Sequence, residues 1–78
     1  MRFPSKEQIA ALQRQYPRGT RVELLGMDDP QAPPTGTMGE VMGVDDAGQL
    51  LVRWETGSSL SLISGVDSFR IAEKGGRS

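Results

Sequence analysis

Apolar residues alternate with polar ones in a series of short segments that runs from residue 20 almost to the end of the chain. A period of two is typical of β-strands that bury one face and expose the other. The predicted strands span residues 20–25, 39–44, 49–55, 58–63 and 69–71, with one tight helical turn at 65–68. Glycines at positions 36, 39, 43, 48, 57 and 65 permit the bends that close a small sheet. We therefore expect a mainly β domain whose five strands bend into a small barrel.

Residues 5–16 have a different period and predict one N-terminal α-helix before the barrel. Its apolar stripe consists of Ile9, Leu12 and Tyr16. Ser5 is a good N-cap, and Gln8, three residues later, completes a capping-box pattern. A helix of about twelve residues is marginally stable alone. We therefore expect the stripe to dock on the barrel or on a partner.

The 78 residues suffice for one domain. We expect it to span residues 1–72, with the barrel over 20–71 and a flexible, charged tail at 73–78. The predicted core comprises Ile9, Leu12, Tyr16, Val22, Leu24, Val41, Val44, Leu50, Val52, Trp54, Leu60, Leu62, Val66, Phe69 and Ile71. This set fills one small core and cannot also line a deep substrate cavity, since such pockets measure roughly 300–1,000 Å³.

The chain contains neither cysteine nor histidine. It therefore lacks a thiolate nucleophile, the usual general base at neutral pH and the commonest transition-metal ligands. We expect no catalytic residues, no metal and no cofactor, and hence no enzyme. The first residues lack the apolar run of a signal peptide, and no stretch reaches the roughly 18 apolar residues of a membrane helix. The expected location is cytoplasmic, without a membrane partner.

Charge is unevenly distributed along the chain. Residues 22–69 carry eight Asp or Glu side chains and one Arg, whereas residues 1–21 carry five Lys or Arg side chains and one Glu. The basic side chains Arg14, Arg18 and Arg21 either contact phosphates of a nucleic acid or neutralise the acidic barrel. We favour neutralisation, because nucleic-acid affinity comes mostly from phosphate contacts, which an acidic barrel repels. The chain also lacks a set of aromatic residues for stacking bases.

The long connection at residues 26–37 is the main candidate for a binding site. Its prolines make it stiff, and Asp28-Asp29 at its start either shape a turn or contact a partner. Trp54 either packs in the core or forms a half-exposed aromatic platform at the barrel mouth. The predicted protein-binding residues are Met27, Asp28, Asp29, Pro30, Pro33, Pro34 and Trp54.

Spaced motifs along the chain resemble a known group of proteins. In order they are Gly19-Thr20-Arg21-Val22, Met27-Asp28-Asp29-Pro30, Pro33-Pro34, Gly36-Thr37, Gly39, Val44-Asp45-Asp46, Gly48, Val52, Trp54, Gly57-Ser58-Ser59-Leu60 and Gly65-Val66-Asp67. Over residues 2–72 this pattern is similar to an uncharacterised family, catalogued only as a domain of unknown function, with members in bacteria, their phages and conjugative elements. More loosely, it resembles the Src-homology-3-like barrels. The resemblance implies a small barrel of that kind and no particular activity.

Three functional hypotheses follow. The first is a non-enzymatic accessory module that binds another protein, as barrels of this kind bind extended peptides or partner surfaces between their loops. The second is a nucleic-acid-associated protein that uses its basic helix. The third rests on the phage and mobile-element context of similar proteins: a small acidic domain that inhibits a host defence nuclease by occupying its basic groove.

Overall fold

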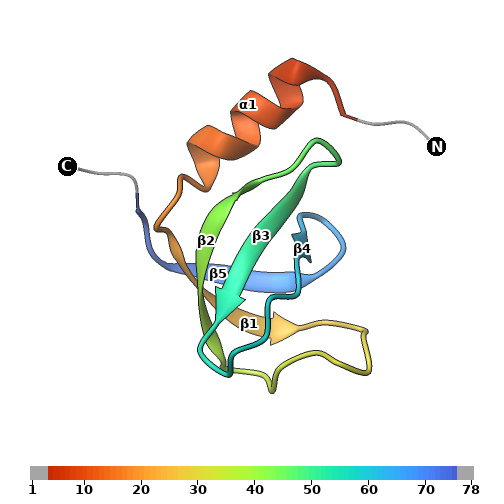
Figure 1. Ribbon diagram of the computed structural model, residues 1–78, viewed down its shortest axis with the longest axis vertical. Coiled ribbons are helices and arrows are strands. Elements are labelled where there is room, and N and C mark those ends of the chain that lie inside the picture. The colour runs from red at the N-terminus through yellow and green to blue at the C-terminus, as the bar shows by residue number, and fades with distance from the viewer. Residues whose placement is uncertain (1–3, 76–78) are drawn as a thin grey trace.

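The computed structural model describes residues 4–75, which form one helix followed by five strands (Figure 1). The elements are α1 (Lys6–Gln15), β1 (Arg21–Gly26), β2 (Met38–Val44), β3 (Gln49–Trp54), β4 (Leu62–Ile63) and β5 (Ser68–Glu73). The strands make one antiparallel sheet in the order β4-β3-β2-β1-β5. The predicted mainly β fold with one N-terminal helix is confirmed, and its topology is compatible with a Src-homology-3-like barrel.

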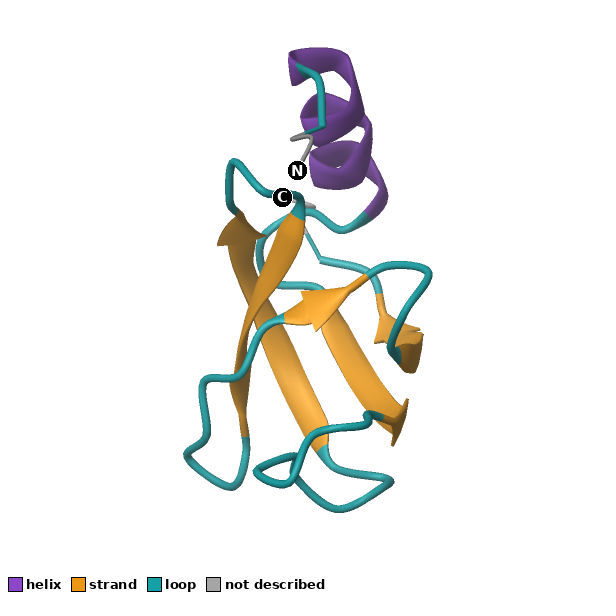
Figure 2. Ribbon diagram, turned by 90° about the vertical axis from the view of Figure 1, so that its right-hand side faces the viewer, coloured by secondary structure: helices purple, strands orange, loops and turns teal. Residues whose placement is uncertain are grey.

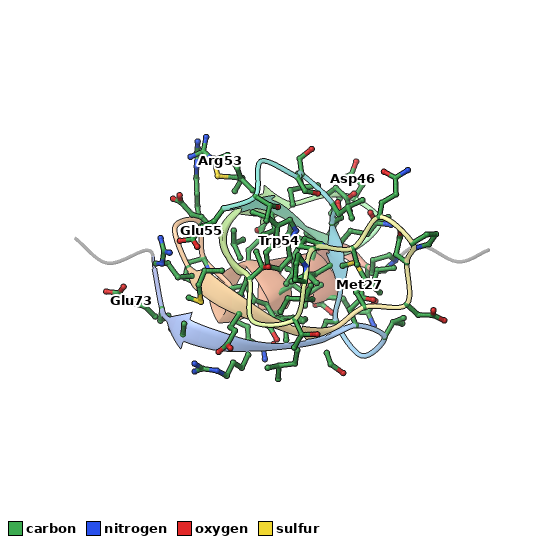
Figure 3. All side chains as sticks on the ribbon, turned by 90° about the horizontal axis from the view of Figure 1, so that it is seen from below. Met27, Asp46, Arg53, Trp54, Glu55 and Glu73 are labelled. Atoms are coloured by element: carbon green, nitrogen blue, oxygen red, sulfur yellow. The ribbon has the colours of Figure 1, made fainter. Side chains whose placement is uncertain are left out.

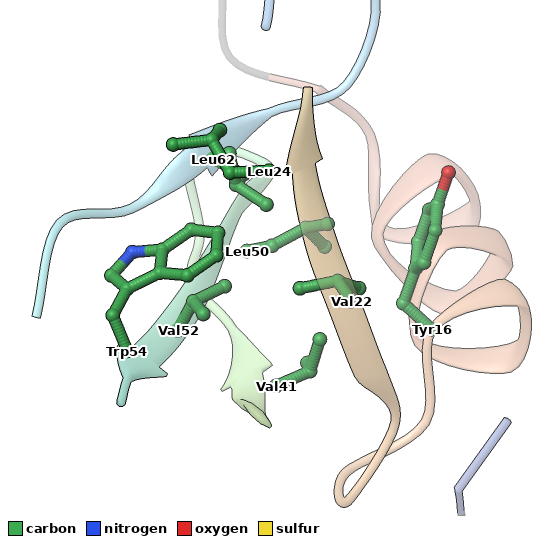
Figure 4. Packing of buried hydrophobic residues seen from close by; sticks show 8 residues of the cluster. All are labelled: Tyr16, Val22, Leu24, Val41, Leu50, Val52, Trp54 and Leu62. Carbon is green, nitrogen blue, oxygen red and sulfur yellow. The ribbon is translucent and has the colours of Figure 1, made fainter. Parts of the chain in front are cut away.

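The sheet bends around a compact core (Figure 4). The buried apolar side chains are Tyr16, Val22, Leu24, Val41, Leu50, Val52, Trp54 and Leu62. Trp54 is the largest of them, and Gly39 on β2 makes room for it. A Cβ atom at Gly39 would lie 2.7 Å from Trp54 Cε3 and 2.6 Å from Val52 Cγ1. A side chain at this position would therefore displace the core, which explains a glycine near the start of β2.

Two residues predicted for the core are exposed instead. Val66 is 73% exposed and Ile71 is 37% exposed. Val66 lies in the turn between β4 and β5, where both its backbone amide and that of Asp67 donate to the Ile63 carbonyl. Ile71 lies on β5 at one end of the strand order, so it has a neighbouring strand on one side only. Other predicted core residues, including Leu12, Val44, Leu60 and Phe69, are partly buried against the cluster.

The fourth strand is shorter than the expected 58–63, because the chain before it wraps around Trp54. The Trp54 indole Nε1 donates to the Leu60 carbonyl at 3.0 Å, and the Trp54 amide donates to the Ser58 carbonyl at 2.8 Å. These bonds hold the segment near the end of β3, and regular pairing with β3 begins only at Leu62. The expected helical turn at 65–68 is a single hydrogen-bonded turn, after which β5 starts at Ser68.

The predicted flexible tail at 73–78 begins too early. Glu73 still belongs to β5. The Gly75 amide donates to the Thr20 hydroxyl at 3.0 Å, and this fully buried hydroxyl donates in turn to the Pro17 carbonyl at 2.6 Å. Thr20 therefore ties the C-terminal segment to the turn that follows the helix. Residues 76–78 lie outside the described part of the chain.

Helix α1 stands at one end of the sheet and touches it with its C-terminal half (Figure 2). The predicted capping box is present, since Ser5 Oγ accepts from the Gln8 amide and Gln8 Oε1 accepts from the Ser5 amide. No residue of Lys6–Gln15 is fully buried. Tyr16, just past the helix, is buried, with its ring 5.6 Å from that of Phe69. Within residues 4–75 no helix is long and apolar enough to cross a membrane.

Candidate functional site

The connection between β1 and β2 is made of two successive turns. The Ala32 amide donates to the Asp29 carbonyl at 3.0 Å, and the Asp29 carboxylate accepts from the Gln31 amide at 2.8 Å. Asp followed by Pro is favoured at the first two positions of a β-turn, because the carboxylate bonds the nearby backbone and proline presets φ. In the second turn the amide and hydroxyl of Thr37 both donate to the Pro34 carbonyl, at 3.1 and 2.6 Å. The sequence-based reading of Asp29 as a turn residue is therefore confirmed.

The β1–β2 connection is attached to the barrel both at its two ends and through residues within it. The Gly36 amide donates to the Leu24 carbonyl at 2.7 Å, and the Leu24 amide donates to the Thr37 carbonyl at 2.9 Å. Met27 packs against the core cluster, and Pro33 is buried. Because both ends and the middle are held, the turns present one defined surface to solvent.

The outward-facing part of the connection is acidic and rich in proline. Asp28, Asp29, Pro30 and Pro34 are all exposed. Neither carboxylate forms an ion pair with another residue in the 4–75 range. We call these four residues the loop tip. The tip therefore carries two negative charges on a backbone that is already ordered.

Trp54 does not belong to this exposed surface. It is 2% exposed and points into the core among Leu24, Leu50 and Leu62 (Figures 3 and 4). Of its two proposed roles, core packing is correct and the exposed platform is wrong. The predicted binding set thus separates into an inner group, in which Pro33 and Trp54 are buried and Met27 is partly buried, and the exposed loop tip.

The basic residues considered for nucleic acid are not gathered into one site. Arg21 lies on β1, and its Nη2 is 2.9 Å from Glu55 Oε2. Arg14 and Arg18 are exposed and form no ion pair within the described residues. Of these three arginines, only Arg21 forms an ion pair with an acidic residue among the described residues.

Two acidic strand residues, Glu40 on β2 and Glu23 on β1, are partnered by arginines of the sheet itself. Arg53 Nη2 lies 3.6 Å from Glu40 Oε1, and Arg70 Nε lies 2.5 Å from Glu23 Oε1. These arginines were not singled out from the sequence. The register would have revealed the pairs, because Arg53 is opposite Glu40 and Arg70 is opposite Glu23 on neighbouring strands.

An open groove of about 610 Å³ lies between α1, the β2–β3 turn and β4. It is lined by Pro4, Gln8, Ala11, Leu12, Gln15, Ala47, Gly48, Ile63 and Ser64, none of which ionises. The sequence carries no local signal of this groove, since the groove depends on how the helix meets the turn. Acid–base chemistry needs a titratable group at the reacting atom, and the groove offers none. No group of three or more potential metal ligands exists among residues 4–75.

Comparison with known families gives one match. A family model described as a domain of unknown function (DUF4314) matches residues 5–72. The match covers α1, the four strands β1 to β4 and β5 as far as Ala72. No curated protein and no solved structure matches the chain.

Proposed function

The chain belongs to the DUF4314 family of domains of unknown function, and we propose that it is a non-enzymatic module that binds another protein through the loop tip. The geometry of the β1–β2 connection carries this proposal. Two hydrogen-bonded turns, anchored by the partly buried Met27 and the buried Pro33, hold Asp28 and Asp29 out into solvent. A small barrel with such a protrusion is suited to recognition at its loops.

The rigidity of the connection favours binding. Ordering a flexible loop on association costs part of the gross interaction energy, and a loop that is already ordered avoids most of that cost. The Asp29 turn and the Pro34 turn are closed by backbone hydrogen bonds in the free protein. The loop tip can therefore meet a partner without a further folding step.

The charge of the loop tip indicates the chemistry of the partner. Asp28 and Asp29 are exposed and unpaired among the described residues, whereas Glu23 on β1 and Glu40 on β2 are each matched by an arginine of a neighbouring strand. Complementary charge steers association and selects partners. We therefore expect a protein segment that bears Arg or Lys.

A non-catalytic role is supported by the chemistry of the chain. It has no histidine and no cysteine. The larger groove has no ionisable lining residue. A smaller hollow, of about 260 Å³, has Arg21 and Glu55, which form an ion pair, together with Arg53 and Glu40, which form another. A third, of about 320 Å³, has Lys6 and Asp46 as its ionisable lining residues.

The test is a selection from a displayed random peptide library, with the protein immobilised. We expect enrichment of peptides that contain Arg or Lys, and loss of their binding in the double variant D28N and D29N. Asparagine retains an oxygen that can accept from the Gln31 amide, so the turn is kept while two charges are removed. The matched control is D46N, an exposed Asp in the β2–β3 turn for which no hydrogen bond or ion pair of its side chain is recorded among residues 4–75.

Selected peptides should bind the D46N protein as they bind the original chain, and weaken as salt is raised. Binding that is equal in all three proteins would refute a role for the loop tip. Retention of nucleic acid in the same format, abolished by R14Q and R18Q, would favour the nucleic-acid alternative instead.

A further inference from the structure

The two outer strands of the sheet differ in how far they are protected against pairing. At one end, β4 has two residues, and the Ile63 amide is already bound to Asp67 Oδ2 at 2.8 Å. At the other end, β5 has six residues and, within residues 4–75, pairs with β1 on one side only. Seen from below, β5 forms the rim of the molecule with β1 on its inner side (Figure 3). An open edge of this kind is a template for another strand.

The hydrogen-bond pattern identifies the residues that face outward from β5. The Thr20 carbonyl accepts from the Val41 amide, and both backbone groups of Leu24 bond residues 36 and 37 on the same side. The backbone amides and carbonyls of the even-numbered residues of β1 therefore point toward β2. Glu23, an odd residue, therefore faces β5, where its partner is Arg70. The flanking residues Phe69 and Ile71 consequently direct their amides and carbonyls away from the sheet.

Few of the usual obstacles to pairing are present on this edge. Ser68–Glu73 contains neither proline nor lysine, the residues that commonly block exposed edges. The charge of Arg70 is matched by Glu23 of the neighbouring strand. One irregularity exists, since Ile71 pairs with Val22 and Glu73 with Arg21, leaving Ala72 as an extra residue. The regular part of the open edge is therefore Phe69–Ile71, with Ile71 37% exposed.

We propose that two copies of this chain associate by antiparallel pairing of their β5 strands, with Ile71 of one copy opposite Ile71 of the other. Charge selects this register. Centring the pair on Arg70 would set two arginines directly opposite each other, which is destabilising. Centring it on Ile71 sets Arg70 opposite the uncharged Ala72 of the second copy, and buries two exposed isoleucines against each other.

A pairing centred on Phe69 is also less favourable. It would set Ile71 opposite Asp67 of the second copy, whose carboxylate is held by the Ile63 amide. The Ile71-centred pair is short, so the interface falls in the weak class below about 1,200 Å². The expected assembly is a weak, rapidly exchanging dimer.

The test is sedimentation of the full chain from about 10 µM to about 1 mM, together with amide NMR spectra, because interfaces of this size are transient. We expect association to rise with concentration, with shifts concentrated at Phe69 and Ile71. I71K should abolish the association by placing two like charges at the two-fold axis. The matched control is L51K, since Leu51 on β3 is similarly exposed, at 40%, but lies away from this edge. It should associate as the original chain does.

A mixture of I71K and I71E tests the register itself. Each variant alone should remain monomeric, and the mixture should regain association, because lysine then lies opposite glutamate. Dispersed NMR spectra of each variant establish that it is folded. A chain that stays monomeric up to the highest concentration, equal loss in L51K, or a mixture that associates no better than its components would overturn the proposal.

Discussion

The β1–β2 connection and helix α1 both lie outside the strands, yet they are attached to the barrel in opposite ways. The connection is bonded at its base through Leu24 and has Pro33 buried in its middle. The helix contains no fully buried residue, and its main anchor is Tyr16, immediately after its last turn. The irregular segment is thus bound into the core more firmly than the regular one.

This difference separates two kinds of stabilisation. Helix α1 is specified locally by its capping box, which acts whether or not the barrel is present. The connection is specified by tertiary contacts, because its buried residues need the finished core around them. We expect the two segments to respond differently when the core, the helix anchor, the cap and the loop turn are altered in turn.

The largest effect should come from W54A. The Trp54 side chain packs in the core and also holds the segment before β4 by a hydrogen bond. Truncating a buried aromatic costs about 3–5 kcal/mol, and here the Leu60 carbonyl also loses its donor. A domain of this size has little stability to spare, so we expect it to be largely unfolded. Urea titration followed by circular dichroism measures this. W54F keeps most of the ring and should lose far less; equal losses in the two variants would contradict a packing role.

Next in size is Y16A, which removes the helix anchor and leaves the barrel strands in place. Tyr16 lies at the margin of the core against Phe69, so we expect a loss of about 2–3 kcal/mol, below the usual range for a central aromatic. Since ten residues are too few for a stable isolated helix, α1 should melt first. Hydrogen exchange should show α1 amides losing protection while Leu24 and Gly36 keep theirs. Simultaneous loss in both segments would break the contrast between them.

The same distinction explains what the sequence can reveal of this fold. The capping box needs only Ser5 and Gln8, so a local pattern is sufficient. Alternation likewise identifies β1, β2 and β3, whose inward residues are buried. Residues 58–61 also alternate, but Trp54 draws their backbone away from a regular ladder. These hydrogen bonds join residues on different segments, so the local sequence pattern does not predict them.

The candidate site shows the same limit. The prolines and the Asp-Pro step predict a stiff turn, and the turn is present. Which residues face outward depends on how the turn meets the core: Pro33 is buried while Pro34, its neighbour, is exposed. The period of two predicts that the Trp54 side chain points inward. It does not predict how much of the side chain is exposed, because the last position of a strand is buried only if another segment packs over it. Here Leu60 and Leu62 follow the strand and cover it.

A smaller effect is expected from S5A, which removes the helix cap without touching the core. The Gln8 amide loses its acceptor, and the loss of an N-cap typically costs about 1 kcal/mol. Because α1 is weakly attached, the cost should appear as faster exchange of its first-turn amides more than as a lower global midpoint. S59A, at an exposed serine outside the helix, is the control. A fall in the global midpoint as large as that of Y16A would mean that the helix is part of the cooperative core.

The smallest effect should come from P30A, which loosens the Asp29 turn while keeping its hydrogen bonds. Proline at this position stabilises chiefly by restricting the unfolded chain, so its loss should cost about 0.4–1 kcal/mol. The Ala32 amide can still donate to Asp29, and Pro33 stays buried. We therefore expect NMR relaxation to show increased motion confined to residues 28–32, with α1 unchanged.

If the loop tip binds a basic partner, this added freedom should weaken binding without removing charge, whereas D28N with D29N removes charge without adding freedom. Equal mobility of the connection in P30A and in the original chain would show that the buried Pro33 and the base hydrogen bonds alone hold it in place.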